Sequence, residues 1–157
     1  AVGGSSPPTY PITSVSWDDA QKFVAWLNNT RPAFRYRLPS EAEWEFIVKK
    51  YGYRVGELKS SVGAVTVVNT NNKGINSVMG NALEWLDDCW HGGYIGAPTN
   101  GRSWNEGIQC HRRIVRGSNW GGEHTLTEEN AHYYRPFGVE KSTRNARIGF
   151  RVAGDRK

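Results

Sequence analysis

Cysteine is scarce in this chain of 157 residues, which has two, Cys89 and Cys110. Two thiolates are too few for the four-ligand site of a structural zinc ion, so a fold held together by four thiolates is excluded. The sequence leaves open whether the two residues form a disulfide or stay as partly buried free thiols.

Long apolar runs are also missing. No stretch approaches the roughly 20 apolar residues that a membrane-spanning helix needs, so we expect no membrane span. Hydrophobic residues make up 38% of the chain and include seven Trp, so aromatic rings must supply much of the buried area. Eighteen glycines indicate a loop-rich fold with many turns.

The length of the chain fits one domain with a core of ordinary size. No signal peptide opens the sequence, and residues 1–10 (AVGGSSPPTY) read as a linker or a processed N-terminus. We therefore expect a single domain over residues 11–157.

The formal charge is +5, and the basic side chains are scattered along the chain rather than gathered in one tract. A basic protein attracts nucleic acid and other anionic surfaces non-specifically. Neither paired zinc-ligand cysteines nor a ribonucleoprotein signature is present, so no specific nucleic-acid partner is expected.

Two segments carry the start signals of helices. Ser16 with Asp19, and Ser40 with Glu43, each form a capping box in which hydroxyl and carboxylate satisfy free backbone N–H groups. Apolar residues then recur at the spacing of one buried helical face. They are Ala20, Phe23, Val24 and Leu27 in the first helix, and Trp44, Ile47, Val48 and Tyr51 in the second.

Three segments read as strands because apolar or β-branched residues are bounded by turn formers, namely residues 63–68, 113–120 and 148–153. The segment 91–107 contains five glycines and one proline and is expected to be a long loop. The adjacent carboxylates Asp87 and Asp88 are expected to be solvated in a loop.

The order of five motifs resembles the formylglycine-generating enzyme (sulfatase-modifying factor) family. The motifs are residues 11–17 (PITSVSW), 36–46 (YRLPSEAEWEF), 80–85 (GNALEW), 113–120 (RIVRGSNW) and 148–153 (IGFRVA). The resemblance implies an α+β, C-type lectin-like fold with two helices, small twisted antiparallel sheets and much coil. Within this family, it extends to the variable proteins of diversity-generating retroelements in bacteria and phages, which use the same fold.

The resemblance also bears on catalysis. In the oxidase members, two cysteines after the "R-G-G-S" turn bind copper, and one of them engages the substrate thiol. The corresponding positions here are Gly122 and Thr127, which cannot bind soft Cu(I) or form a mixed disulfide. We therefore expect no catalytic residues and no copper, and interpret the chain as a non-enzyme.

A calcium ion is the one cofactor that the resemblance leaves open. Family members hold Ca²⁺ around the "G-N-x-x-E-W" turn, and the matching positions are Ser77, Gly80, Ala82 and Glu84. Ser77 departs from the pattern, because a hydroxyl is a poorer ligand for a hard cation than a carboxylate or amide oxygen.

The segment between the last two motifs mixes aromatic, His and Arg side chains with small polar ones. Such side chains offer wide contact area and hydrogen-bonding tips, which recognition surfaces use. The candidate ligand-binding residues are Trp104, Asn119, Trp120, His124, His132, Tyr134 and Phe137.

The leading hypothesis is a non-catalytic module that binds a protein or cell-surface ligand, with carbohydrate still open as a ligand class. One alternative is a formylglycine-generating-type oxidase or another enzyme on the same fold. A second is an accessory domain of a bacterial signalling or envelope protein. The compartment is not assigned, and the cell surface, secretion and a phage particle are all compatible with the sequence.

Overall fold

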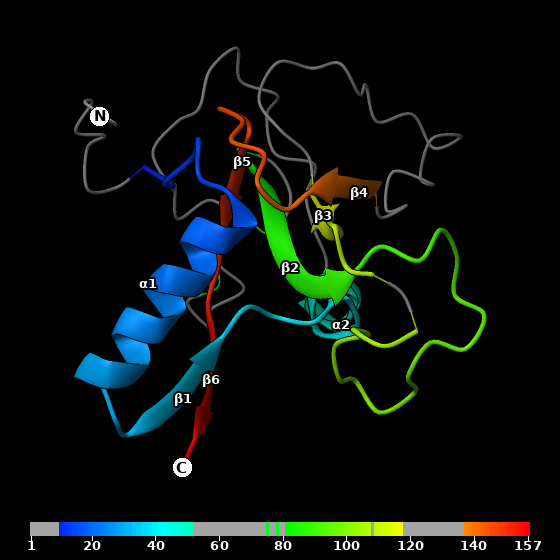
Figure 1. Cartoon of the computed structure of the whole chain (residues 1–157). Helices are drawn as coiled ribbons and strands as arrows, with labels where there is room; N and C mark the ends of the chain where they lie inside the picture. Colours follow the sequence, from blue (N-terminus) through cyan, green and yellow to red (C-terminus); the bar gives the residue numbers. More distant parts are fainter. Residues whose placement is uncertain (1–9, 52–74, 76–77, 79–80, 108, 118–136) are drawn as a thin grey trace.

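The computed structural model describes residues 10–51, 75, 78, 81–107, 109–117 and 137–157 (Figure 1). Two helices and six strands follow in the order α1 (Trp17–Thr30), β1 (Phe34–Arg37), α2 (Glu41–Tyr51), β2 (Leu83–Cys89), β3 (Arg112–Arg116), β4 (Phe137–Glu140), β5 (Ile148–Phe150) and β6 (Ala153–Arg156). The predicted strand over residues 63–68 and the expected linker up to residue 9 lie outside the described residues.

Both helices begin where the capping boxes predict. The Ser16 hydroxyl accepts from the Asp19 N–H at 3.1 Å, while the Asp19 carboxylate accepts from the Ser16 N–H at 3.0 Å. At α2, the Glu43 N–H donates to the Ser40 hydroxyl at 3.1 Å and the Ser40 N–H donates to Glu43 at 2.9 Å. Each box satisfies N–H groups that the first helical turn leaves without partners.

The strands form two small sheets. One contains four strands in the order β4-β3-β2-β5, and the other pairs β1 with β6. The pairing of β2 with β5 is parallel, so the larger sheet is mixed rather than purely antiparallel as expected. In Figure 1, α1 lies beside the β1–β6 pair, and α2 lies against the end of β2 near Cys89.

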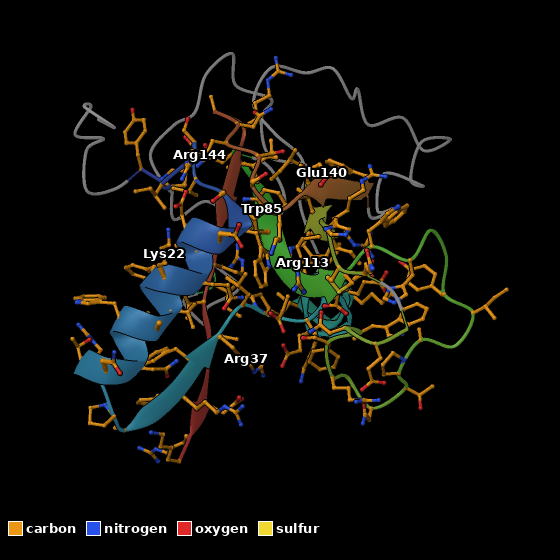
Figure 2. The ribbon with its side chains drawn as sticks, in the orientation of Figure 1. Lys22, Arg37, Trp85, Arg113, Glu140 and Arg144 are labelled. Atoms are coloured by element: carbon orange, nitrogen blue, oxygen red, sulfur yellow. A yellow bond between two sulfur atoms is a disulfide. The ribbon has the colours of Figure 1, made fainter. Side chains whose placement is uncertain are left out.

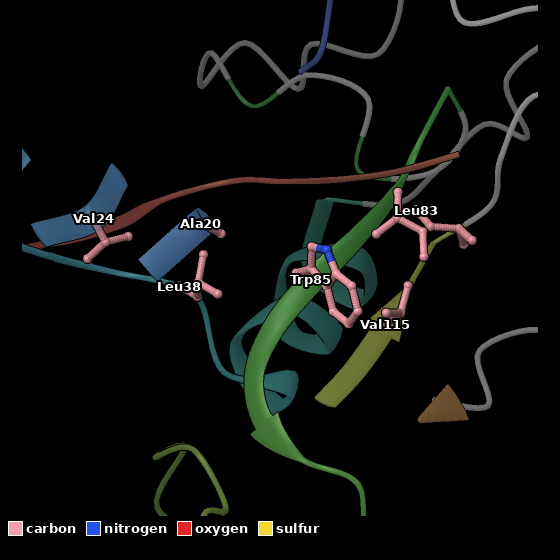
Figure 3. Packing of buried hydrophobic residues seen from close by; sticks show 7 residues of the cluster. Ala20, Val24, Leu38, Leu83, Trp85 and Val115 are labelled. Carbon is pink, nitrogen blue, oxygen red and sulfur yellow. The ribbon is translucent and has the colours of Figure 1, made fainter. Parts of the chain in front are cut away.

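Buried side chains lie in two clusters on either side of β2. Ala20, Val24, Leu38, Leu83 and Trp85 belong to the larger cluster, which α1 and the four-stranded sheet enclose (Figure 3). Trp44, Val48, Leu86 and Ile114 form the second cluster beneath α2. Figure 2 shows Trp85 in the centre of the molecule, whereas Lys22 points outward from α1.

Two details differ from the sequence prediction. Phe23 was placed on the buried face of α1, but its side chain is 41% exposed and lies edge-on against Phe150. Residues 148–153 were read as one strand, yet β5 ends at Phe150 and β6 begins at Ala153 in the other sheet. The break at residues 151–152 turns Arg151 toward Glu84, with which it forms an ion pair.

Candidate functional site

The β3–β4 hairpin frames the segment in which most binding residues were predicted. Val115 on β3 pairs with Phe137 on β4, so the described strands that flank the segment 118–136 lie next to each other. Gly117 leaves β3 with φ +100°, a conformation that strains other residues. Most of the predicted site lies outside the described residues, namely Asn119, Trp120, His124, His132 and Tyr134, together with Gly122 and Thr127.

Phe137 is the one predicted contact residue at the described edge of this segment. Its side chain is 43% exposed at the first position of β4. The next residue, Gly138, is covered by the Trp90 ring, with which any added Cβ would overlap. Because successive strand residues face opposite sides, Trp90 anchors β4 from one side while Phe137 is displayed on the other.

Trp104 comes from the expected long loop, residues 91–107, and is only partly exposed. Its ring stacks on the His91 ring with centroids 3.5 Å apart and planes 2° apart. Its backbone N–H donates to the Asp88 carboxylate at 2.8 Å, and its carbonyl accepts from the Cys89 N–H at 3.0 Å. The Trp104 side chain therefore has a structural partner, and its role in ligand binding stays a prediction.

Cys89 and Cys110 form a disulfide at the base of this loop, with Cα atoms 5.4 Å apart. Cys89 is fully buried at the end of β2. The chain contains no other cysteine, so neither of its two cysteines is left as a free thiol.

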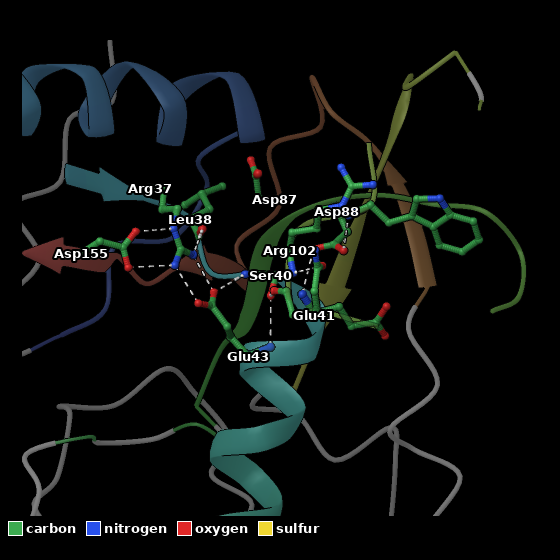
Figure 4. Close-up of polar contacts among 12 residues, drawn as sticks. Arg37, Leu38, Ser40, Glu41, Glu43, Asp87, Asp88, Arg102 and Asp155 are labelled. Atoms are coloured by element: carbon green, nitrogen blue, oxygen red, sulfur yellow. Dashed lines mark hydrogen bonds and ion pairs between the residues drawn. The ribbon is translucent and has the colours of Figure 1, made fainter. Parts of the chain in front are cut away.

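Asp88 corrects the prediction of a solvated loop, because it lies in β2 and is 4% exposed. Its carboxylate accepts from the Glu41 N–H at 2.8 Å as well as from Trp104. Burial raises the pKa of Asp88, although the two backbone N–H groups oppose that shift. Asp88 thus ties the first turn of α2 to the 91–107 loop (Figure 4).

Glu41 continues this polar network. It accepts from the Tyr94 hydroxyl at 2.7 Å and lies 2.9 Å from the Arg116 guanidinium. Burial raises the pKa of Glu41 and outweighs the attraction of Arg116. Arg116 is itself almost fully buried, pairs also with Glu45 and lies over the Trp44 ring. Sequence reasoning treated these residues as parts of motifs and did not predict that they meet.

Glu84 was predicted as a calcium ligand, but the structure gives its oxygens other partners. Arg151 donates to both carboxylate oxygens, and the Trp44 indole N–H donates to Oε2 at 3.0 Å. A guanidinium in contact with the carboxylate would repel a divalent cation, so Glu84 as placed does not fit a calcium ion. Ala82 is buried beside it, whereas Ser77 and Gly80 lie outside the described residues.

No group of three or more His, Cys, Asp or Glu side chains suited to a metal ion occurs among the described residues. Within the same residues, neither helix is long and apolar enough to cross a bilayer.

An open hollow of about 580 Å³ lies between α2 and residues 99–101. Its lining is largely apolar and comprises Pro39, Ala42, Glu43, Phe46, Ile47, Thr99, Asn100, Gly101 and Ala153. Glu43 is held by two hydrogen bonds from Arg37, at 2.6 and 2.7 Å (Figure 4). Burial alone would raise the pKa of Glu43, but the hydrogen bonds from Arg37 and from the Ser40 N–H, together with the charge of Arg37, outweigh burial and lower the pKa.

Curated proteins with similar sequences include the formylglycine-generating enzyme of Bos taurus, 28% identical over 112 residues. That match covers 53% of this chain and 28% of the enzyme. The serine/threonine-protein kinase pkn1 of Chlamydia caviae is 27% identical over 160 residues, covering 92% of this chain and 24% of the kinase. The chain therefore spans about a quarter of the length of these two relatives.

Two solved structures share the fold. PvdO from Pseudomonas aeruginosa superposes with a TM-score of 0.80 at 27% identity, covering 97% of this chain and 64% of PvdO. Treponema denticola variable protein 1 superposes with a TM-score of 0.67 at 19% identity, covering 100% of this chain and 74% of that protein.

The family model of the sulfatase-modifying factor enzyme 1-like domain matches residues 2–56 and 47–156 of the chain. The fold agrees with the one that the five motifs imply, since two helices and small sheets in much coil are found in the described residues. The chain therefore belongs to the sulfatase-modifying factor family.

Proposed function

We propose that this chain is a non-catalytic ligand-binding module that displays a C-terminal binding face on a lectin-like scaffold. The proposed face comprises residues 119–147, and the proposed contact residues are Trp104, Asn119, Trp120, His124, His132, Tyr134 and Phe137. The fold that the chain shares with Treponema denticola variable protein 1 supports a scaffold of this kind.

The observation that carries this proposal is the use of both cysteines. Copper-dependent oxidation of a substrate thiol needs thiolates that can reach the metal and the substrate. The two cysteines of this chain are bonded to each other, and Cys89 is fully buried. The family resemblance aligns Gly122 and Thr127 with the thiols of the oxidase members, and neither of these residues can bind Cu(I) or bond to a substrate thiol.

The ligand class that we favour is a protein or another cell-surface molecule, and a carbohydrate remains a second class to test. Phe137 supports the choice of a protein ligand, because a half-exposed aromatic ring at the start of a strand offers apolar contact area at low entropic cost. If the chain is a variable protein of a diversity-generating retroelement, sequences from many clones will differ within residues 119–147. A uniform segment with no neighbouring reverse transcriptase would remove that assignment.

Two alternatives have a specific observation behind them. An oxidase is favoured by the relatives named formylglycine-generating enzyme. An accessory domain of a signalling protein is favoured by pkn1, in which the matched region covers about a quarter of a larger chain.

An assay of enzymatic turnover distinguishes the proposed binding module from an oxidase. The chain is incubated with Cu(I), oxygen and a cysteine-containing sulfatase peptide, and formylglycine is measured by mass spectrometry. We expect no product and no tight Cu(I) binding in competition with a chelator. The variant Gly122→Cys/Thr127→Cys is the matched control, because it returns thiols to both positions. Formylglycine formed by the unaltered chain would overturn the proposal.

A second experiment tests the binding face itself. The chain is applied to arrays of purified surface proteins and glycans, alongside the variant His132→Ala/Tyr134→Ala/Phe137→Ala. The control variant is Phe23→Ala/Trp26→Ala, which alters exposed aromatic residues on α1. We expect every specific ligand to be lost in the first variant and kept in the second. Ligands that respond only to the α1 variant would place the binding site elsewhere.

A further inference from the structure

The 91–107 loop contains Asn100 followed directly by Gly101, and no other asparagine of the chain precedes a glycine. Asn100 is exposed, and its side-chain Oδ1 accepts from the Arg102 N–H at 3.2 Å. This contact is an Asx turn, in which an asparagine side chain bonds to the backbone two residues later. The side-chain amide of Asn100 is therefore held against the backbone that follows it.

The backbone nitrogen of Gly101 is the nearest nucleophile to this amide along the chain. Among the described residues, the Gly101 N–H has no hydrogen-bond partner. Glycine has no Cβ to crowd the approach, and the space around the position of a Cβ is open. The Gly101 carbonyl is fixed by the hydroxyl of Ser40, at the start of α2, which donates to it at 2.7 Å (Figure 4). Nucleophile and amide thus belong to one anchored, exposed turn.

A second Asx turn offers a comparison within the same molecule. Asn145 is also exposed, and its Oδ1 accepts from the Arg147 N–H at 2.8 Å. The residue between them is Ala146, which has a methyl group where Gly101 has a hydrogen. The two turns share their exposure and their side-chain hydrogen bond, but they differ in the residue whose nitrogen must attack.

We propose that Asn100 is a site of spontaneous deamidation, which places a new carboxylate in the wall of the hollow beside α2. The Gly101 nitrogen forms a bond to the side-chain carbon Cγ of Asn100, and the bond from Cγ to Nδ2 breaks. Ammonia leaves with the proton of the Gly101 nitrogen, and a cyclic succinimide remains. Water then opens this ring at either carbonyl, which gives aspartate or isoaspartate without oxidation or reduction. The Arg102 N–H favours the first step, because it faces the oxygen on which negative charge develops.

The product changes this side of the molecule in two ways. Asn100 and Glu43 both line the hollow, so the new carboxylate adds negative charge to a largely apolar surface. In isoaspartate the backbone runs through the former side chain and gains one methylene. The carbonyl of Gly101 then moves relative to Ser40, whose hydroxyl loses its acceptor. Deamidation to isoaspartate would therefore loosen the contact between the 91–107 loop and α2.

Peptide mass spectrometry of the whole chain follows the reaction. The chain is incubated at mildly alkaline pH beside a synthetic peptide with the sequence of residues 97–104. We expect Asn100 to become aspartate and isoaspartate on the timescale of the peptide, while Asn145 keeps its amide. An Asn100 that stays an amide after the peptide has converted would overturn the proposal. No ligand takes part, so the result is independent of the proposed binding function.

Variants at both turns test the role of glycine. We expect loss of the product in Gly101→Ala, and also in Asn100→Gln, whose longer side chain must close a larger ring. Because Gly101 has φ +80°, where alanine is strained, Ala146→Gly makes the same test at the other turn. We expect Asn145 to deamidate in Ala146→Gly. Asn145 reacting as fast as Asn100 in the unaltered chain, or staying an amide in Ala146→Gly, would contradict the role assigned to glycine.

The structural consequence is measured by thermal denaturation. The isoaspartate form is separated from the incubated chain by ion exchange and compared with Asn100→Asp, which has the new charge without the added methylene. We expect the isoaspartate form to unfold at a lower temperature, because only this form displaces the Gly101 carbonyl from Ser40. Equal unfolding temperatures would contradict the loosening of the loop.

Discussion

Two carboxylate–guanidinium pairs of similar geometry lie in contrasting regions of this molecule. Arg151 binds Glu84 through both oxygens next to β2, where their side chains are 21% and 8% exposed. Arg144 binds Asp19 through both oxygens at the start of α1, where the corresponding exposed fractions are 57% and 26%. The two ion pairs share their geometry but differ in how far their side chains are exposed to solvent.

The contrast shows that the environment of an ion pair decides what its loss does. Water can solvate whichever partner remains at the surface, so exposed pairs contribute about 0–1 kcal/mol. A buried partner left alone has no such compensation and costs about 3–5 kcal/mol. Four sets of variants, from the largest expected effect to the smallest, measure how much the buried and the exposed contacts of this molecule contribute to its stability.

Glu84→Gln is expected to lower the free energy of unfolding by about 3–5 kcal/mol, because removing the charge of the buried Glu84 breaks its ion pair with Arg151 inside the protein. Chemical denaturation monitored by Trp fluorescence measures the change. The double variant Glu84→Leu/Arg151→Met is the control and should be less destabilised, since it removes both charges. A loss below about 1 kcal/mol for Glu84→Gln would mean that this pair behaves as a surface pair.

The double variant Cys89→Ser/Cys110→Ser removes the disulfide that joins the buried end of β2 to residue 110. The bridge joins residues 21 positions apart. Loop-closure entropy predicts a loss of about 3 kcal/mol, measured by denaturation without reductant. Adding a dithiol reductant to the unaltered chain should reproduce most of this loss and leave the double variant unchanged. If neither the double variant nor the reduced unaltered chain lost stability, the loop would be held in place without the disulfide.

Ser40→Ala and Ser16→Ala compare two buried N-caps that differ in one further hydrogen bond of the hydroxyl. Each loses a hydrogen bond to a helical N–H, which costs about 1 kcal/mol. The Ser40 hydroxyl also donates to the Gly101 carbonyl at 2.7 Å, so its loss leaves a second group unpaired. We expect Ser40→Ala to be more destabilising by about 1 kcal/mol in thermal denaturation. Equal losses of stability in the two variants would show that a water molecule replaces the Ser40 hydroxyl as the donor to the Gly101 carbonyl.

Arg144→Gln is expected to have the smallest effect, at most about 1 kcal/mol, because the pair is exposed. Hydrogen bonds from Arg144, then from Ser16, lower the pKa of Asp19 to about 2. A lowered pKa stabilises the folded state above the unfolded value, which is about 3.9, and this contribution is lost as the pH falls from about 4 to 2. NMR titration should show the Asp19 pKa rising in Arg144→Gln while that of Asp155 stays low. An unchanged Asp19 pKa would assign the shift to Ser16 alone.

The helices could be predicted because their start signals are local. Ser16 with Asp19 and Ser40 with Glu43 need only a spacing of three residues. The strand β2 was missed because Glu84, Asp87 and Asp88 make it resemble a loop. Its burial becomes clear only when Arg151 and the N–H of Glu41 supply partners, and these lie far away in the sequence.

The candidate site could be predicted only in outline. The motifs, with Gly122 and Thr127 in place of cysteines, lead to the prediction of a non-catalytic surface, but they do not say which side chains lie close together. The pairing of Cys89 with Cys110 was open because it depends on how β2 and the residues before β3 meet in space. The ring nitrogens of His91 lie 2.9 Å from the carbonyl oxygen of Cys89 and 2.8 Å from that of Glu106. No sequence signal predicts these contacts, since backbone acceptors do not depend on residue type.

The hairpin formed by β3 and β4 has a practical consequence for engineering. Because Val115 and Phe137 are paired, any peptide grafted between them begins and ends at fixed neighbouring points. Doubling the length of such an insert costs only about 0.6 kcal/mol in chain entropy. This hairpin is therefore the place where foreign peptide libraries could be accommodated without redesign of the scaffold.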